Sequence, residues 1–304
     1  MTTTTASAPT YPLPRERNLI LGSLLVLAGA AWGVLAWQAA ETDEMSLTMG
    51  MSAPLFIALW VVMMVAIMFP TAAPMILMFA RIHNSKRDRG QNFVPTWVFT
   101  SAYLLVWSAT GIAAYAIAVA GDALAGESTW VMDNAPRIGG GLLVFAGVYQ
   151  LTPLKDICLS KCRTPVSFLM NSWRDGYAGA FRMGLDHGVF CLGCCWLLFL
   201  ILFPLGMMNI IVLALITALI FAEKSLPVGR HVARAAALAL VLYGAVVIFE
   251  PNALPMTMDS DAMEMTGSGQ METMDGGMES DANADGTNTM PGDTGEMPMD
   301  GMSR

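Results

Sequence analysis

Long apolar stretches, separated by short loops whose charge alternates in sign, constrain the fold of this chain more than any other feature. The stretches run over about Asn18–Ala40, Pro54–Ala80, Val94–Ala120, Ile138–Leu154, Asp186–Met208 and Asn209–Ala222, followed by a last one that ends at Glu250. A hydrophobic share of 55% exceeds the roughly 45–50% found in soluble domains. The sequence therefore predicts an all-α polytopic transmembrane bundle of about seven spans in a lipid bilayer.

Loop charge predicts how these spans are oriented. The N-terminal segment 1–17 and every second loop are rich in Lys and Arg, whereas the loops between them are acidic or almost uncharged. Because basic loops stay in the cytoplasm, we expect a cytoplasmic N-terminus, a cytoplasmic polar segment at 155–186 and an extracytoplasmic C-terminus in a prokaryotic inner membrane. The sixth stretch is short for a hydrocarbon core of about 30 Å, so the fifth and sixth could instead be two half-crossings.

Composition changes after the helical domain predicted at 18–250. Eleven of the 24 Asp and Glu residues lie from Met256 onward, beside a single Arg304, so the net charge of −8 belongs to this end and the remainder is slightly basic. This end also lacks large apolar side chains other than Met, which predicts that 251–304 is a disordered acidic tail. No nucleic-acid partner is expected.

The tail contains eleven methionines. Two thioethers at MxM or MxxM spacing can reach one ion, and thioether ligation favours Cu(I). The pairs predicted to capture metal are Met256 and Met258, Met263 and Met265, Met271 and Met274, and Met297 and Met299. The alternative is a merely solubilising tail, against which the density of methionine argues.

Thiols and an imidazole gather in the fifth stretch. Cys191, Cys194 and Cys195 stand at helical spacing, with His187 one turn earlier and Met183 a turn before that. Sulfur and imidazole on one helix face suit a soft metal such as Cu(I) or Zn(II). The alternative is that each free cysteine is a small buried hydrophobe, but three cysteines beside a histidine favour a metal site.

A second pair of thiols lies upstream in the polar segment, at Cys158 and Cys162. Two thiolates at this spacing can share one ion, and a reducing cytosol argues against a lasting disulfide between them. The alternative is two unrelated loop cysteines. The other histidines, His83 and His231, lie in basic loops and are expected to be solvated rather than to bind metal.

The second stretch presents a stripe of thioethers. Its members, which follow helical spacing and are predicted to bind metal inside the membrane, are Met64, Met68, Met75 and Met78. Pro70 and Pro74 are expected to break or kink this helix at mid-depth, as in discontinuous spans at transport sites. The alternative is that methionine is adaptable packing between helices.

These motifs occur in a fixed order, and together they resemble a known family. The order is the proline-containing Met stretch, then Cys158-Leu-Ser-Lys-Cys162-Arg163-Thr-Pro165, then Cys191-Leu-Gly-Cys-Cys-Trp196. In these motifs the chain is similar, over about Asn18–Glu250, to the DUF2182 family of predicted metal-binding integral membrane proteins. The resemblance implies metal binding in the helical domain, and it does not include the tail.

The leading hypothesis is a non-enzymatic membrane protein that binds Cu(I) and relays it, either as import or as delivery to a copper chaperone or another membrane subunit. In this hypothesis the tail gathers the ion, the Met stripe conducts it, His187 and the cysteines after it receive it, and the upstream pair passes it on. One alternative is a thiol-disulfide oxidoreductase using Cys191 and Cys194 with Cys158 and Cys162. The other is a non-catalytic assembly subunit.

Overall fold

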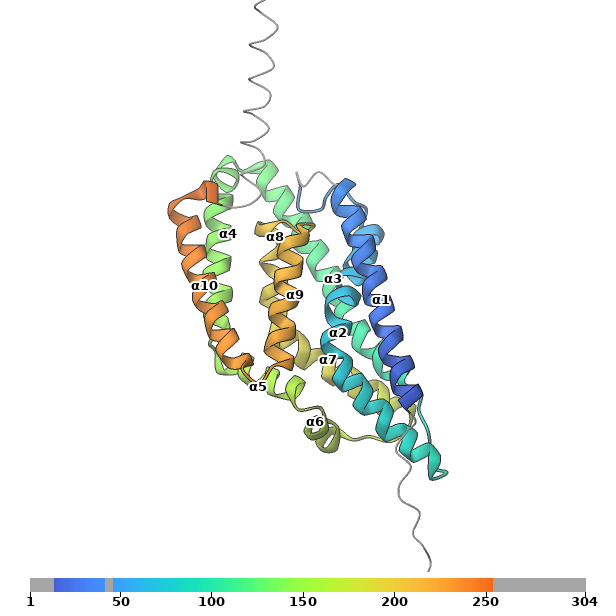
Figure 1. Cartoon of the computed structure of the whole chain (residues 1–304). Coiled ribbons are helices and arrows are strands. Elements are labelled where there is room, and N and C mark those ends of the chain that lie inside the picture. The colour runs from blue at the N-terminus through green and yellow to red at the C-terminus, as the bar shows by residue number, and fades with distance from the viewer. Residues whose placement is uncertain (1–13, 42–45, 254–304) are drawn as a thin grey trace, which may run out of the picture. The chain divides into compact units, whose positions relative to one another are not determined.

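The computed structural model describes residues 14–41 and 46–253, and within these ranges every regular element is a helix (Figure 1). The elements are α1 (Pro14–Glu41), α2 (Ala53–Asp88), α3 (Thr96–Glu127), α4 (Thr129–Tyr149), α5 (Pro153–Arg163), α6 (Pro165–Ser172), α7 (Gly176–Leu200), α8 (Leu202–Leu205), α9 (Ile210–Ser225), α10 (Gly229–Phe249) and the short 3-10 helix η1 (Pro251–Ala253). The predicted all-α class is confirmed for this part of the chain. The tail methionines lie outside the described residues.

Several of these helices are long and apolar enough to cross a membrane, so the chain is a membrane protein. Within the described ranges, five segments qualify, namely α1, α2, α3, α7 together with α8, and α10, and a sixth span results if α4 and α5, bent by 64°, count as one. Seven spans are therefore not confirmed. Two of the predicted spans do not qualify by themselves. Helix α4 qualifies only together with α5. Helix α9 has 16 residues, fewer than the roughly 20 that a span needs.

Local sequence signals start the shorter helices. Pro153 and Pro165 lie in the first turns of α5 and α6, where a missing backbone N–H removes no helical hydrogen bond. The side chains of Thr152 and Asn209 accept hydrogen bonds from backbone N–H groups in the first turns of α5 and α9. The polar segment predicted at 155–186 is accordingly helical over most of its length.

Helix α2 runs without interruption through Pro70 and Pro74. A break at mid-depth, which was one of the two outcomes predicted from the sequence, does not occur. Each proline removes one backbone hydrogen bond, yet a membrane offers no water to the backbone, so packed neighbours favour keeping the helix intact. The thioethers of the Met stripe therefore all project from a single helix.

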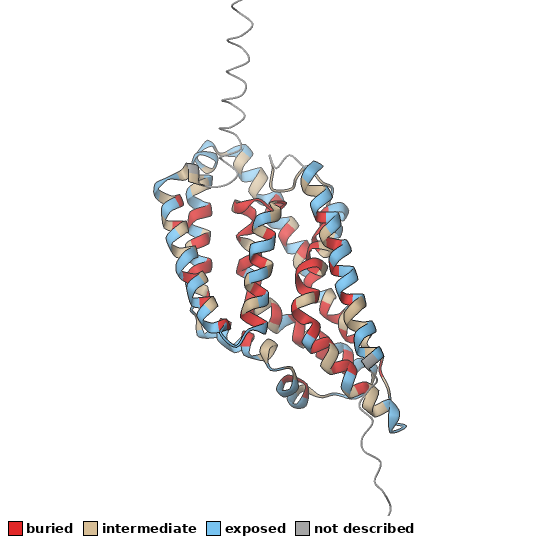
Figure 2. Ribbon diagram, viewed as in Figure 1, coloured by how far each residue is buried: buried red, intermediate tan, exposed pale blue. Residues whose placement is uncertain are grey.

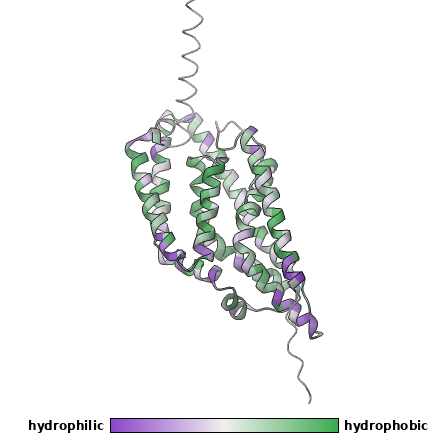
Figure 3. Cartoon of the chain, viewed as in Figure 1, coloured by the Kyte–Doolittle hydropathy of each residue, from purple (hydrophilic) through white to green (hydrophobic). Residues whose placement is uncertain are grey.

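The centre of the bundle is formed by α2 and α7. In the apolar window of each, 61% of the residues are buried, compared with 22% in α1, α3 and α10. Figure 2 shows buried residues concentrated on the inner helices, and Figure 3 shows apolar residues along the helices with hydrophilic ones near their ends. The exposed aliphatic side chains of α1, α3 and α10 are therefore suited to contact with lipid.

Glycines bring neighbouring backbones together at two interfaces. A Cβ added at Gly140 of α4 would lie 2.8 Å from the carbonyl oxygen of Gly244 in α10, so the absence of a side chain lets the two helices pack closely. A Cβ added at Gly188 of α7 would lie 2.8 Å from Val106 of α3, and one at Gly184 would collide with the α3 backbone. Close approach to α3 thus fixes the position of α7, on which the cysteines lie.

His83 corrects a prediction. It is buried in α2, stacks on Trp173 at a centroid distance of 5.1 Å and makes a tilted ring contact with Phe79 at 4.4 Å. Its Nδ1 accepts a hydrogen bond from the backbone N–H of Val94 at 3.3 Å. The prediction of a solvated side chain is wrong because α2 continues beyond the apolar stretch that was used to end it. His231 is exposed, as predicted.

Candidate metal centre

Three thiols from two helices meet inside the bundle. The Sγ atoms of Cys162 in α5 and of Cys191 and Cys194 in α7 all lie within 4.8 Å of one another. We call these residues the three-cysteine cluster. Cys191 and Cys194 are buried and Cys162 is partly buried. Because two sulfurs bound to one ion at about 2.3 Å are at most about 4.6 Å apart, the cluster can hold a soft metal ion with little movement.

The cluster forms because α5 packs closely on α7. The Sγ of Cys158 would lie only 2.7 Å from a Cβ added at Gly193, so the absence of a side chain at this position lets α5 approach. The hydroxyl of Tyr149, at the end of α4, donates a hydrogen bond to the Gly193 carbonyl at 2.5 Å. Cys158 itself therefore faces the α7 backbone, one helical turn away from the cluster.

Three further side chains, each from another helix, surround the Cys191 sulfur. Met68 of α2 places its Sδ 3.9 Å from this Sγ, and Tyr103 of α3 places its hydroxyl 3.2 Å away. Lys224, near the end of α9, places its Nζ 3.0 Å from the same Sγ and 3.9 Å from the Met68 sulfur. A thioether and an ammonium group thus complete the surroundings of the thiols.

The charge of Lys224 has no carboxylate partner within 4.0 Å in the described part of the chain. The neighbouring buried carboxylate, Glu223, is 2.6 Å from the buried ammonium of Lys155 instead. A buried cation is costly unless it is paired and hydrogen-bonded. The Cys191 sulfur is its closest polar contact, so the site combines soft ligands with a fixed positive charge.

Other residues predicted as ligands lie near the cluster but outside it. Cys195 is buried, and its Sγ donates to the Cys191 carbonyl oxygen at 2.9 Å. His187 stacks on Tyr103 at a centroid distance of 5.3 Å and makes a tilted ring contact with Phe168 at 5.6 Å, and its Nδ1 has no hydrogen-bond partner among the described residues. Met183 is buried in the α7 core.

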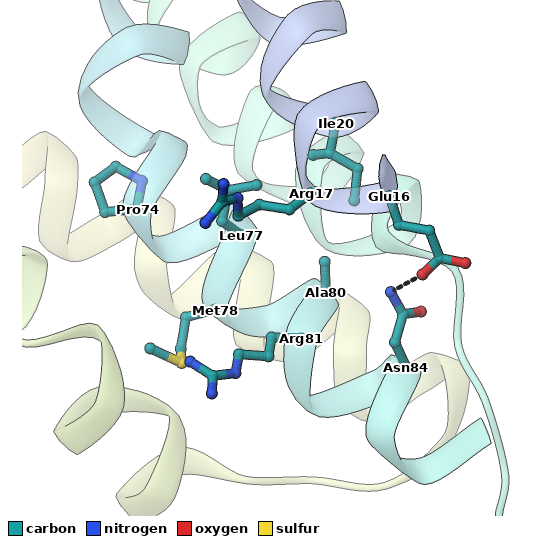
Figure 4. Close-up of a pocket in the computed structure, with 9 residues that line it drawn as sticks. All are labelled: Glu16, Arg17, Ile20, Pro74, Leu77, Met78, Ala80, Arg81 and Asn84. Carbon is teal, nitrogen blue, oxygen red and sulfur yellow. Dashed lines mark hydrogen bonds between the residues drawn. The ribbon is translucent and has the colours of Figure 1, made fainter. Parts of the chain in front are cut away.

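Among the membrane thioethers, the structure brings Met68 to the cluster. Met64 and Met75 are buried in α2, and Met78 is partly buried and lines a pocket between α1 and α2 (Figure 4). The metal-binding role of Met64, Met75 and Met78 stays a prediction.

Sequence reasoning missed Lys224 and Tyr103. Lys224 follows the predicted end of the sixth stretch at Ala222, but α9 continues through it to Ser225. The available signal was that no turn residue separates Glu223 and Lys224 from the apolar run before them. Tyr103 lies within an apolar stretch and offers no comparable signal.

The comparisons with known proteins agree with a copper site. The family model PpoB2, described as copper chaperone, matches residues 57–247, a range that includes the three-cysteine cluster, Met68 and Lys224. It is the same family that the motifs resemble under the label DUF2182, although the label differs. No curated protein and no solved structure matches the chain significantly.

Proposed function

Because this chain belongs to the PpoB2 family of copper chaperones, we propose that it binds Cu(I) as cargo at the three-cysteine cluster and relays it within or across the membrane. The observation that supports this most directly is the convergence of three sulfurs, from α5 and α7, to within 4.8 Å of one another. Thiolate ligands select Cu(I) and Zn(II) over hard ions.

The thioether of Met68 favours Cu(I) over Zn(II) as the cargo. It lies 3.9 Å from the Cys191 sulfur, close enough to become a further ligand after a small movement. Thioethers bind Cu(I) well, whereas structural Zn(II) sites use thiolate, imidazole and carboxylate ligands. The nearby imidazole of His187 is engaged in aromatic stacking instead.

The charge of Lys224 offsets that of a Cu(I) complex with two thiolates. Two thiolates and one Cu(I) have a net charge of −1, and the ammonium of Lys224 lies 3.0 Å from the Cys191 sulfur. A neutral assembly is the arrangement that a medium of low dielectric constant tolerates best. The third cysteine of the cluster then binds Cu(I) as a neutral thiol, because three thiolates with Lys224 would balance Zn(II) instead.

We infer that the relay proceeds from thioethers to thiolates. Met64 lies one turn before Met68 on α2, and thiolates hold Cu(I) more tightly than thioethers do, so the ion moves toward the cluster. Met75 and Met78 lie beyond Met68, toward the end of α2 that the basic loop places in the cytoplasm. Cys158 lies one turn from Cys162 on α5 and is the proposed next acceptor. Capture by the tail methionines remains a prediction outside the described residues.

The arrangement of the helices suits an extracytoplasmic tail. The start of α1 and the end of α10 lie at opposite ends of the helical body (Figure 1). With a cytoplasmic N-terminus, as the basic loops predict, the chain after α10 begins on the other side of the membrane. The tail and the cysteine pair Cys158 and Cys162 would then lie on opposite sides of the membrane.

The test is a Cu(I) titration of the reduced, detergent-purified full chain against a competing chelator. We expect a Cys194→Ser variant, and separately a Cys162→Ser variant, to lose the tight site. The matched control is Cys195→Ser, which removes an equally buried thiol outside the cluster and should keep it. Equal loss in all three variants, or no tight site in the unchanged chain, contradicts the proposal.

A second assay distinguishes copper relay from the alternative function, a thiol-disulfide oxidoreductase. Turnover of a dithiol or disulfide probe that depends on Cys191 and Cys194, in a protein that lacks tight Cu(I) binding, would favour thiol exchange. Tight binding without such turnover supports the relay.

A further inference from the structure

Polar contacts join both ends of α5 to the end of α9, beside which it lies in Figure 1. In the first turn of α5, the ammonium of Lys155 lies 2.6 Å from the carboxylate of Glu223, and both side chains are buried. At the last residue of α5, Arg163 donates hydrogen bonds to the backbone carbonyl oxygens of Leu226 and Pro227 at 2.8 and 3.4 Å. These carbonyl groups belong to the turn between α9 and α10. The two cysteines of α5 lie between the two contacts.

The turn after α9 has room for the Arg163 guanidinium group. A Cβ added at Gly229, the first residue of α10, would collide with the carbonyl oxygen of Glu223 and would lie 2.9 Å from a guanidinium nitrogen of Arg163. The absence of a side chain at this position therefore lets the guanidinium group fit. Hydrogen bonds from a charged donor are stronger than those between neutral groups. Because Arg163 directly follows Cys162 in the chain, these bonds restrict the movement of the cysteine.

The contacts determine which face of α5 points toward the three-cysteine cluster. Lys155 and Cys162 are seven residues apart, about two helical turns, so they lie on the same face of α5. Pairing of Lys155 with Glu223 therefore turns Cys162 inward. A shift of the helix by one residue would rotate this face by about 100° and carry the Cys162 sulfur out of the cluster. An isolated helix of 11 residues is only marginally stable, so the register depends on tertiary contacts.

The end of α9 also contacts the other helix of the cluster. Lys224 directly follows Glu223, and its Nζ lies 3.0 Å from the Sγ of Cys191 in α7. Two consecutive residues of α9 thus contact α5 and a thiol of α7. Helix α9 therefore fixes the two cysteine-bearing helices relative to each other, in addition to the direct packing of α5 on α7 at Gly193.

We propose that the end of α9 positions the third thiol of the metal centre, with Lys155 and Arg163 of α5 as the positioning residues. Their contacts hold α5 in the register that places the Cys162 sulfur beside those of Cys191 and Cys194. Neither positioning residue is a proposed ligand, and each acts through Cys162. The inference rests on the proposed Cu(I) function, whereas the position of the thiol can be tested without copper.

The first experiment compares Arg163→Gln with a matched control, Lys161→Gln, using the full chain in detergent. Both variants remove one positive charge from a partly buried side chain of α5, but Lys161 makes no hydrogen bond or ion pair with another residue in the described part of the chain. In Arg163→Gln we expect about tenfold weaker Cu(I) binding, the effect of one hydrogen bond to a charged group, and one sulfur ligand fewer by X-ray absorption. Lys161→Gln should bind within about twofold of the unchanged chain and keep all sulfur ligands. Arg163→Lys, which retains a cationic donor, should restore the missing sulfur.

The second experiment uses metal-free protein. Diamide, which takes two electrons and two protons from a pair of thiols, should link Cys162 to Cys191 or Cys194 by a disulfide that peptide mass spectrometry detects. The rate of this cross-linking should fall about tenfold in Arg163→Gln. It should also fall in a Lys155→Met, Glu223→Gln double variant, which removes both buried charges together so that neither is left unpaired.

An unchanged cross-linking rate in Arg163→Gln, or equal losses in Lys161→Gln, overturns the proposal. A lower unfolding temperature of Arg163→Gln with all sulfur ligands still bound to Cu(I) would show a merely structural contact and overturns it as well. If the unchanged chain binds no Cu(I) but the variants cross-link as expected, the proposed function fails and the positioning of Cys162 stands.

Discussion

Replacing Lys224 by Met tests the role of the buried cation in the metal centre. The ammonium lies 3.0 Å from the Cys191 sulfur, and a methionine side chain of similar length keeps the volume while removing the charge. In Cu(I)-loaded protein the variant leaves an anionic thiolate complex without its counter-charge. In metal-free protein it removes a buried cation that has no carboxylate within 4.0 Å in the described residues, so the two states should respond in opposite directions.

The magnitude follows from Coulomb's law. Two unit charges about 4 Å apart interact by about 4 kcal/mol at an effective dielectric constant near 20. Since the negative charge of a thiolate complex is spread over at least two sulfurs, we take about half of this, or roughly 2–3 kcal/mol. Cu(I) affinity should therefore fall about 30- to 150-fold. The free energy of unfolding of the metal-free variant should stay unchanged or rise, as when a buried charge is replaced by an apolar group of similar volume.

The assay is competition for Cu(I) with a chelator of known affinity at fixed pH and salt, together with thermal unfolding of the metal-free protein in the same detergent. The matched control is Lys86→Met, because the Lys86 ammonium pairs with Asp175 rather than with the cluster. A folded Lys224→Met protein that binds Cu(I) within about twofold of the unchanged chain refutes the charge argument.

Three further predictions concern packing, ligation and pH. Gly193→Ala should destabilise the fold by about 1–3 kcal/mol, visible as a lower unfolding temperature, because the new Cβ would meet a cysteine sulfur of α5 at 2.7 Å; an unchanged temperature contradicts this. Met68→Leu should weaken Cu(I) binding roughly tenfold while Met64→Leu leaves it unchanged, and equal effects would remove the thioether from the site. The hydrogen bond from Lys86 lowers the pKa of Asp175, so its stabilising contribution is present above the ordinary carboxyl pKa and is lost as the pH falls through the lowered value. Melting curves of Asp175→Asn at pH 7 and pH 3 should therefore show less acid sensitivity than those of the unchanged chain.

Much of the metal centre follows from helical spacing. Cys191 and Cys194 are three residues apart and must lie near one another on any helix. Cys162 belongs to the second pair of thiols, which the sequence analysis identified as possible metal ligands. Spacing alone cannot say which side of α7 receives α5. Cys194 and Cys195 project about 100° apart around the helix axis, and packing of α5 decides that Cys194 joins the cluster.

The burial of charged and titratable residues near helix ends was harder to predict from the sequence. Lys224 and His83 follow apolar runs, where hydropathy predicts the beginning of a loop, but both helices continue past them into the protein. A side chain at the end of a helix becomes buried or solvated according to which other element packs on it. The residues of that other element are distant in the sequence, so hydropathy around the side chain does not reveal the contact. The same limit applies to α4 and α9, whose length and composition alone do not establish a crossing.

Because Cys162 lies on α5, an 11-residue helix, an ion bound at the three-cysteine cluster would link α5 to α7. An ion held jointly by Cys162 and by the α7 thiols closes the intervening residues into a ring, which restricts the conformations open to α5. Metal occupancy and docking of α5 on α7 then reinforce each other by equal free energies. If a partner drew α5 away from α7, the site would lose one of its three sulfurs, and its affinity for the ion would fall.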